Sequence, residues 1–151
     1  MVEELATLYR ERLGDFTRVA AAIVGDADAG RDAVQDAFAT AIRKRRRFRG
    51  EGTLEAWVWR IVVNAARDAR RLRLRKHPDV PEPLAARADE LGIPLDRLSA
   101  RQREVLFLHY YADLDYAAIA AALGIATGTV GATLSAARGA LREALTQEVT
   151  R

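Results

Sequence analysis

The chain has 151 residues, of which half are apolar, and it carries a formal net charge of +3 with no cysteine. This length and composition fit one ordinary domain or two small helical ones, and they exclude a disulfide framework, a thiolate metal site and a cysteine nucleophile. No stretch approaches the ~18 consecutive apolar residues of a membrane span, and the first residues lack the order of a signal peptide, so we expect no membrane insertion and a cytoplasmic location.

Three amphipathic helices are predicted in the first half of the chain. Apolar residues recur at helical spacing over 3–24, and Gly25 is expected to end this helix. Asp28 can cap a second helix, which runs into the basic cluster RKRRRFR at 43–49. A third helix is predicted over 54–75, with a buried stripe of Leu54, Trp57, Val58, Ile61, Val62, Ala65 and Leu72. Nothing alternates with period two, so we expect no sheet.

The second half begins with a proline-rich window. All four prolines lie within 77–94, where they fix the backbone and remove amide donors, so we expect a linker with at most one short helical turn. The fold class is therefore predicted to be all-α. It comprises a three-helix bundle at 1–76, the linker at 77–95 and a helix-turn-helix domain at 96–151.

The helix-turn-helix prediction rests on capping residues and a glycine turn. Ser99 and Gln102 form a capping box for a helix that reaches about residue 111. Asp115 can cap a short helix that ends at Gly124, where a positive φ is expected, and a longer helix follows over 127–147. Its inward residues are expected to be Val130, Leu134, Ala137, Leu141 and Leu145, which pack with Ile119 and Leu123.

Positive charge is concentrated in the first half. Residues 1–76 contain 17 Lys and Arg against 11 Asp and Glu, a net charge of +6, whereas residues 77–151 contain 7 against 10, a net charge of −3. Because sequence-independent affinity for nucleic acid comes from neutralised phosphates, this split predicts that a polyanion is held mainly by the first half. The alternative is that the charges only solvate helix faces.

Three segments together resemble the two characteristic regions of the ECF-type (extracytoplasmic function, group 4) sigma factors of the bacterial sigma-70 family. They are DAVQDAFATAI, FRGEGTLEAWVWRIVVNAARDARR and LSARQREVLFLHYYADLDYAAIAAALGIATGTV, in the family's order. The resemblance implies a region 2-like first domain and a region 4-like second domain. It also implies an RNA polymerase sigma factor that binds core RNA polymerase and promoter DNA, directs promoter recognition and opening, and is held by an anti-sigma protein.

The resemblance implies a minus-10 DNA contact in the first domain. The residues at the matching positions are Phe48, Arg49, Trp59, Arg60, Asn64 and Arg67. Aromatic faces beside positive charge can hold bases out of the stack. Trp59 falls about 200° around the helix from Trp57, so we expect its ring to be exposed, with an interdomain contact as the alternative. Phe48 could equally fill the core below the loop.

A second implied surface meets the polymerase. Asp32, Gln35 and Asp36 occupy the matching face of the second helix at i, i+3 and i+4. Without the resemblance, a solvated helix face is the plainer interpretation of these residues.

The recognition helix departs from the family's pattern. Residues that face outward and could contact a minus-35 element are Thr127, Thr129, Thr133 and Arg138, but the usual Lys, Ser and Arg are replaced at Gly131, Ala132 and Thr133, and a further Arg at Ala136. Such short side chains cannot reach base edges as Arg does. Three interpretations stay open: weak contact through hydroxyls and backbone, a protein-docking module bound by an anti-sigma protein or by the chain's own first half, or decayed promoter reading.

No catalytic constellation is present in the sequence. His77 and His109 stand apart, and no paired carboxylates, nucleophile or metal-ligand spacing occurs, so we expect no enzyme, no metal site and no cofactor. The alternative to a promoter-reading sigma factor is a sigma-like regulatory protein that binds polymerase or an anti-sigma factor without efficient promoter reading. A dimeric helix-turn-helix repressor would need a charged reading helix, which the chain lacks.

Overall fold

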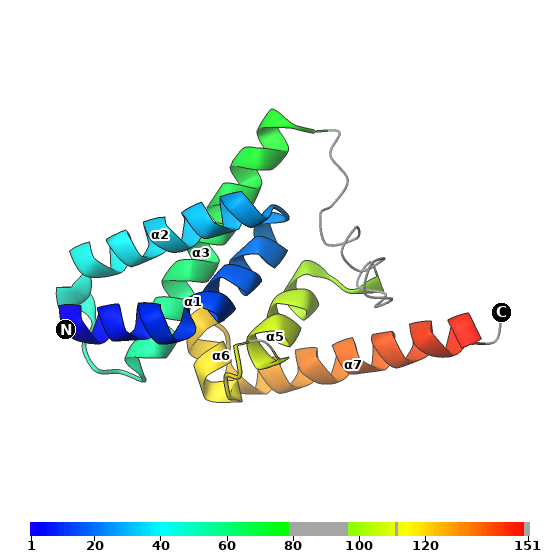
Figure 1. Ribbon diagram of the computed structural model, residues 1–151. Coiled ribbons are helices and arrows are strands. Elements are labelled where there is room, and N and C mark those ends of the chain that lie inside the picture. Colours follow the sequence, from blue (N-terminus) through cyan, green and yellow to red (C-terminus); the bar gives the residue numbers. More distant parts are fainter. Residues whose placement is uncertain (79–96, 111, 150–151) are drawn as a thin grey trace.

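The computed structural model describes residues 1–78, 97–110 and 112–149, and it contains helices and no strand in these ranges (Figure 1). The elements are α1 (Val2–Val24), α2 (Ala27–Arg43), a 3-10 turn η1 (Arg45–Arg47), α3 (Leu54–Lys76), α5 (Ala100–Tyr110), α6 (Tyr116–Leu123) and α7 (Thr127–Val149). The prediction of an all-α fold is confirmed. The predicted linker falls almost entirely on 79–96, outside the described residues.

α1 and α2 form an antiparallel pair joined by a tight turn. Gly25 ends α1 with φ of 88°, as predicted, because this left-handed conformation carries no side-chain clash in glycine. The cap of α2 is Asp26 and not Asp28, since the Asp26 carboxylate accepts a hydrogen bond from the backbone N–H of Ala29 at 2.9 Å. Asp28 lies in the first turn, two residues past the capping position, and pairs with Arg31 at 3.5 Å.

α3 is buried over a wider arc than the predicted stripe. Its fully buried residues are Ala56, Val58, Trp59, Val62, Val63 and Ala66. The arc is wide because α1 and α2 cover one side of α3 while α6 covers another. Leu72, predicted to be buried, is 52% exposed, because the last turns of α3 project past the helices that cover it (Figure 1).

The second half has the predicted caps. The Ser99 hydroxyl accepts from the Gln102 N–H at 3.2 Å, and the Gln102 side-chain oxygen accepts from the Ser99 N–H at 2.9 Å, which completes a capping box. Asp115 caps α6 through the Ala118 N–H at 2.8 Å, and Gly124 ends it with φ of 68°.

α7 buries Val130, Leu134, Ala137 and Ala144. Leu145, predicted to be inward, is 47% exposed. The buried residues repeat every three or four positions and return to the same face at Ala144, so Leu145 lies about 100° further around the helix. α7 runs along the second half as its longest helix and projects beyond α5 (Figure 1).

The two halves share one apolar core. Buried residues from α1, α2 and α3 and from α5, α6 and α7 belong to a single cluster, with α6 packed against α3. The Ala-rich sequence of α6 permits this close packing because alanine adds little bulk between two helix backbones. None of the described helices is long and apolar enough by itself to cross a membrane. Only α6 and α7 taken together have the required length and apolar composition, and this pair is bent by 102°.

Candidate nucleic-acid interface

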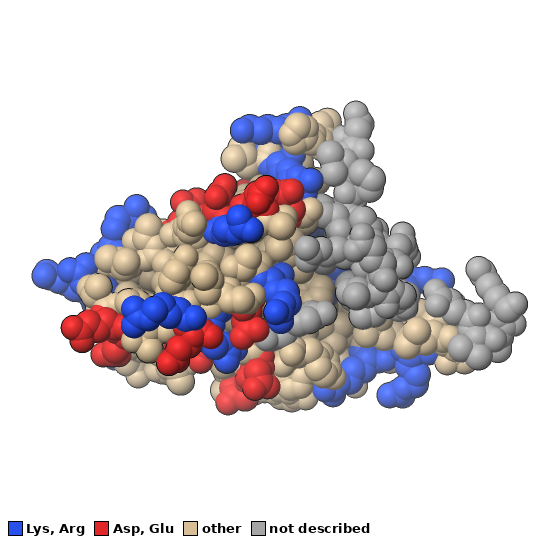
Figure 2. All heavy atoms as spheres, in the orientation of Figure 1, with Lys and Arg blue, Asp and Glu red and all other residues tan. Residues whose placement is uncertain are grey.

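The turn between α2 and α3 carries a dense group of arginines. Arg46, Arg47 and Arg49 are exposed, while Arg45 folds back and its guanidinium donates to the Ile42 carbonyl at 2.7 Å, which satisfies the end of α2. In Figure 2, Lys and Arg side chains gather over this end of the bundle and again over the projecting end of α3. Two basic surfaces therefore flank α3, one before it and one at its last turns.

An aromatic pair lies beside the first basic surface. Phe48 contacts Trp57 with ring centroids 5.5 Å apart and an angle of 46° between the rings, and both side chains are half-buried. Each ring thus has one side against the protein and part of its surface in solvent. Trp57 is a candidate site residue that sequence reasoning assigned to the core.

The predicted exposure of Trp59 is wrong. Its side chain is 0% exposed, and its ring lies 4.3 Å, centroid to centroid, from that of Phe16 on α1. A ring enclosed in this way cannot stack on a base, so Trp59 is a core residue. The signal for this was present in the spacing of Ala56, Trp59, Val63 and Ala66, which forms a second apolar stripe on α3.

Three polar residues follow one another along α3 at i, i+4 and i+7. Arg60 and Asn64 are exposed, and the Arg60 guanidinium reaches to within 3.8 Å of the position a Cβ on Gly124 would take. Arg67 is held differently, because its Nε donates to Glu104 Oε1 on α5 at 3.0 Å and its Nη2 pairs with Glu104 Oε2. The structure therefore brings Arg60, Asn64 and Arg67 onto one side of α3, next to the second half of the chain.

The polar residues predicted on α2 lie on its outer face. Asp32, Gln35 and Asp36 are all exposed, whereas their neighbours Ala33, Val34 and Ala37 are buried. Figure 2 shows acidic side chains gathered above α2, well apart from the arginines of the α2–α3 turn. This acidic, solvent-facing surface suits a protein partner better than it suits nucleic acid.

The start of α7 is open to solvent but uncharged. Thr127 and Thr129 are exposed and Thr133 is half-buried. Arg138 is engaged elsewhere: its Nε donates to the Tyr110 hydroxyl at 2.9 Å, and its guanidinium lies 5.7 Å from the centre of the Tyr110 ring. The hydrogen bond to Tyr110 raises the pKa of Arg138 above its ordinary value, so the group stays cationic.

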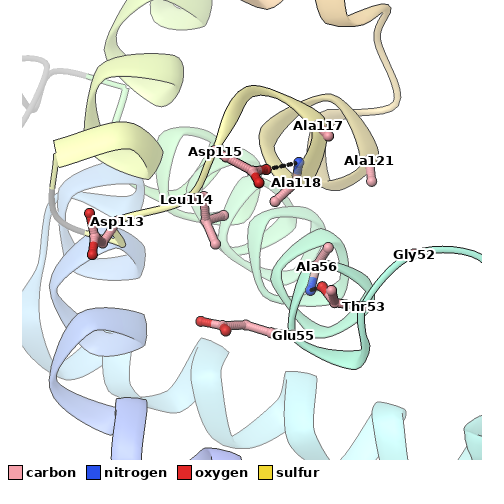
Figure 3. Close-up of a pocket in the computed structure, with 10 residues that line it drawn as sticks. All are labelled: Gly52, Thr53, Glu55, Ala56, Asp113, Leu114, Asp115, Ala117, Ala118 and Ala121. Carbon is pink, nitrogen blue, oxygen red and sulfur yellow. Dashed lines mark hydrogen bonds between the residues drawn. The ribbon is translucent and has the colours of Figure 1, made fainter.

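A cavity of about 310 Å³ lies along the seam between the two halves (Figure 3). It is lined by Gly52, Thr53, Glu55 and Ala56 at the start of α3 and by Asp113, Leu114, Asp115, Ala117, Ala118 and Ala121 around the start of α6. Three of its polar residues already have local roles, because Thr53 and Asp115 cap their helices and Glu55 pairs with Arg12 at 3.4 Å. Within the described ranges no grouping of His, Asp or Glu could hold a metal ion.

Two family models match this chain. The model for Sigma-70 region 2 matches residues 8–76, and the model for Sigma-70 region 4 matches residues 95–141. The chain belongs to the sigma-70 family. Its resemblance to the ECF-type sigma factors is confirmed by curated relatives of that type.

Among these relatives, the ECF RNA polymerase sigma factor SigM of Mycobacterium tuberculosis is 35% identical over 79 residues, which cover 52% of this chain and 38% of SigM. This sigma-70 family chain therefore matches well under half the length of that relative. The RNA polymerase sigma factor SigV of Bacillus subtilis is 28% identical over 129 residues, which cover 80% of this chain and 78% of SigV.

Two solved structures share the fold of this sigma-70 family member over both halves. CnrH in complex with the cytosolic domain of CnrY superposes with a TM-score of 0.74 and 26% identity over 95% of this chain and 88% of that chain. The sigma factor RpoE in complex with the anti-sigma factor NepR, from Bartonella quintana, gives 0.73 and 25% over 95% and 98%. Each superposition covers 95% of this chain, so it extends over residues of both halves.

Proposed function

We propose that this chain is a promoter-specificity subunit that binds core RNA polymerase, recognises promoter DNA and directs its opening for transcription initiation. The observation that carries the proposal is the pairing of two different surfaces on one region 2 fold. The outer face of α2 is acidic and polar, and the α2–α3 edge is basic and aromatic. A polymerase contact and a DNA contact can therefore be made at the same time from different surfaces of one bundle.

The minus-10 contact is assigned to Phe48, Trp57, Arg49, Arg60, Asn64 and Arg67. Opening a duplex requires that extruded bases be held, and each base stacked on an aromatic ring contributes on the order of 1–3 kcal/mol. The Phe48–Trp57 pair offers half-exposed rings beside exposed arginines, so it takes the role that Trp59 cannot fill. The arginines would neutralise the phosphates of the strand that is held.

The minus-35 contact is assigned to the start of α7 and is expected to be weak. Thr127, Thr129 and Thr133 offer hydroxyl groups that reach phosphates more readily than base edges. Arg138 is the one long polar side chain of residues 129–141, and it is already held by Tyr110. Promoter affinity should therefore come mainly from the first half of the chain.

The chain would act in the cytoplasm with three partners. Core RNA polymerase and promoter DNA follow from the proposed activity, and an anti-sigma protein is proposed because RpoE is similar in fold and is bound to one. The chemistry of RNA synthesis would belong to the polymerase, so no enzymatic activity is proposed for this chain.

Transcription with core enzyme tests the proposal directly. Core RNA polymerase is mixed with the chain and with fragmented DNA from the chain's own source, and the transcripts are sequenced. Promoter-selective initiation that depends on the chain supports the proposal. Binding to core without any open complex would instead select the regulatory alternative.

The polymerase contact can be separated from the DNA contact by substitutions on α2. Gln35→Ala combined with Asp36→Ala should weaken binding to core polymerase about tenfold, which corresponds to roughly 1.4 kcal/mol. Stability should stay unchanged because both side chains are exposed. Surface plasmon resonance with immobilised core enzyme measures the affinity, and Glu3→Ala on α1 is the matched control. Unchanged binding would mean that this face of α2 is only solvated.

The aromatic pair can be tested by Trp57→Ala. With core enzyme saturated by the variant, the rate of promoter opening should fall about tenfold or more, because a stacked base contributes on the order of 1–3 kcal/mol. Permanganate reactivity of unpaired thymines measures the opening, and Leu72→Ala on the same helix is the control. Equal losses of polymerase binding and of opening would show that Trp57 serves only the fold.

A further inference from the structure

The ion pair between Arg67 and Glu104 joins the two halves of the chain at the proposed DNA contact. The guanidinium meets the carboxylate through two of its nitrogens, in the planar geometry that arginine also uses for phosphate. The Glu104 side chain is only 9% exposed, and Arg101 adds a second positive charge 3.9 Å from it. A carboxylate of α5 thus holds the group that would otherwise bind a DNA strand.

Other contacts hold the second half over the same side of α3. α6 packs against α3, and the Arg60 guanidinium lies at the turn that ends α6. The Arg12 side chain on α1 donates to the Ala112 carbonyl between α5 and α6. These contacts place the turn that ends α6 beside Arg60 and place α5 beside Arg67, whereas Asn64 between them stays exposed.

We propose that α5 and α6 form a built-in competitor for promoter DNA, in which the Glu104 carboxylate occupies Arg67 in place of a backbone phosphate. This inference rests on the proposed minus-10 contact of Arg67. It adds that the described arrangement is a closed state, from which the second half must move away before the strand is bound along α3. The start of α7 stays exposed in the closed state, so the masking acts on the first half alone.

The physical consequence is a shift in apparent affinity. When only the open state binds DNA, the apparent dissociation constant equals the intrinsic one divided by the open fraction. A change that weakens the closed state therefore strengthens DNA binding without adding any contact to DNA. A change that removes Arg67 weakens the closed state as well, but it also removes a contact to DNA.

The opening can be measured on the full chain by pulsed electron resonance between two spin labels. The chain has no cysteine, so Arg10→Cys on α1 and Glu143→Cys on α7 introduce two exposed labelling positions, one in each half. Glu104→Gln and Arg67→Ala are each made in this background. Affinity is measured in parallel, without labels, by fluorescence anisotropy with a short single-stranded DNA of mixed sequence.

Both variants should lengthen the distance between the labels, but their effects on DNA binding should be opposite. Glu104→Gln is expected to tighten binding about fivefold or more, a coupling of ordinary size between two sites. Arg67→Ala is expected to weaken it. Glu3→Gln changes the net charge as Glu104→Gln does, on an exposed residue of α1, and should leave both readouts unchanged.

Two results would overturn the inference. The first is an unchanged distance in both variants, which would mean that the ion pair does not hold the halves together. The second is a longer distance in Glu104→Gln with no more gain in DNA affinity than in Glu3→Gln, which would mean that the closed state masks nothing. Since the distance is measured on the protein alone, failure of the closed state is distinguishable from failure to direct transcription.

If Glu104→Gln does not fold, as judged by circular dichroism, the distance between the spin labels in Arg67→Ala shows whether the ion pair holds the closed state. The distance between the labels in the otherwise wild-type chain is then measured with and without the single-stranded DNA, to test whether the closed state masks the DNA contact. Lengthening by DNA supports the inference, and an unchanged distance at saturating DNA rejects it.

Discussion

Trp59→Ala is expected to lower the free energy of unfolding by about 3–5 kcal/mol, the usual cost of removing a large aromatic side chain from a core. The indole is fully buried and packs on Phe16, so its removal leaves a cavity that helices on both sides of α3 would have to fill. A loss of this size is a large part of the total stability of a small domain. Much of the variant is therefore expected to be unfolded or prone to aggregation.

Urea unfolding followed by circular dichroism measures this loss, and two variants serve as controls. Trp59→Phe should cost clearly less, because the indole Nε1 has no hydrogen-bond acceptor among the described residues and only part of the ring volume is removed. Trp57→Ala should also cost less, since Trp57 is half-buried. A stable Trp59→Ala variant that binds polymerase but fails to open promoters would show that Trp59 takes part in the DNA contact.

Gly30→Ala is expected to destabilise the chain by about 1–3 kcal/mol or more, as overpacking of a tight contact does. A Cβ at position 30 would lie 2.6 Å from both the Cα and the backbone N of Ala21, and these backbone atoms cannot move aside without shifting α1 against α2. The glycine is therefore required by the close approach of the two helices. Separation of α1 from α2 would also disturb α3, which packs on both.

Gly14→Ala provides the opposite expectation within the same bundle. Gly14 lies in α1 with nothing near its added Cβ, so alanine should stabilise the helix by roughly 0.5–1 kcal/mol. Thermal unfolding of the two variants beside the wild type compares them directly. A gain in stability from Gly30→Ala would show that α1 and α2 are further apart than described.

Most helix boundaries could be predicted because they depend on residues close in sequence. Gly25, Ser99, Asp115 and Gly124 act at the positions expected, since a cap needs only a side chain and a backbone group within a turn of each other. The displacement of the α2 cap from Asp28 to Asp26 shows the limit of this local information. Both aspartates can cap, and the choice depends on where the turn from α1 allows α2 to begin.

The orientation of α3 could not be predicted from one stripe. The helix carries two apolar stripes, one with Trp57 and one with Trp59. The prediction that Trp57 is buried and Trp59 exposed assumed that only one face of α3 is covered. The stripe with Trp59 packs against α1, where the indole meets Phe16, and so it is fully buried, whereas Trp57 is half-buried. The exposure of Arg49, Arg60 and Asn64 and the half-buried ring of Phe48 agree with a surface role. Arg67, by contrast, is held by a partner that lies 37 residues away in the chain.

The amino-acid sequence by itself determined the helices, their caps and the family of this chain, because local spacing and short motifs carry that information. Only the tertiary structure decided which indole is buried, how closely α1 and α2 approach, and which anion Arg67 holds. These features depend on the packing of α1 against α3, on the approach of the α1 and α2 backbones and on the placement of Glu104 of α5 beside Arg67. Such contacts join residues far apart in the chain, and no spacing within a single helix encodes them.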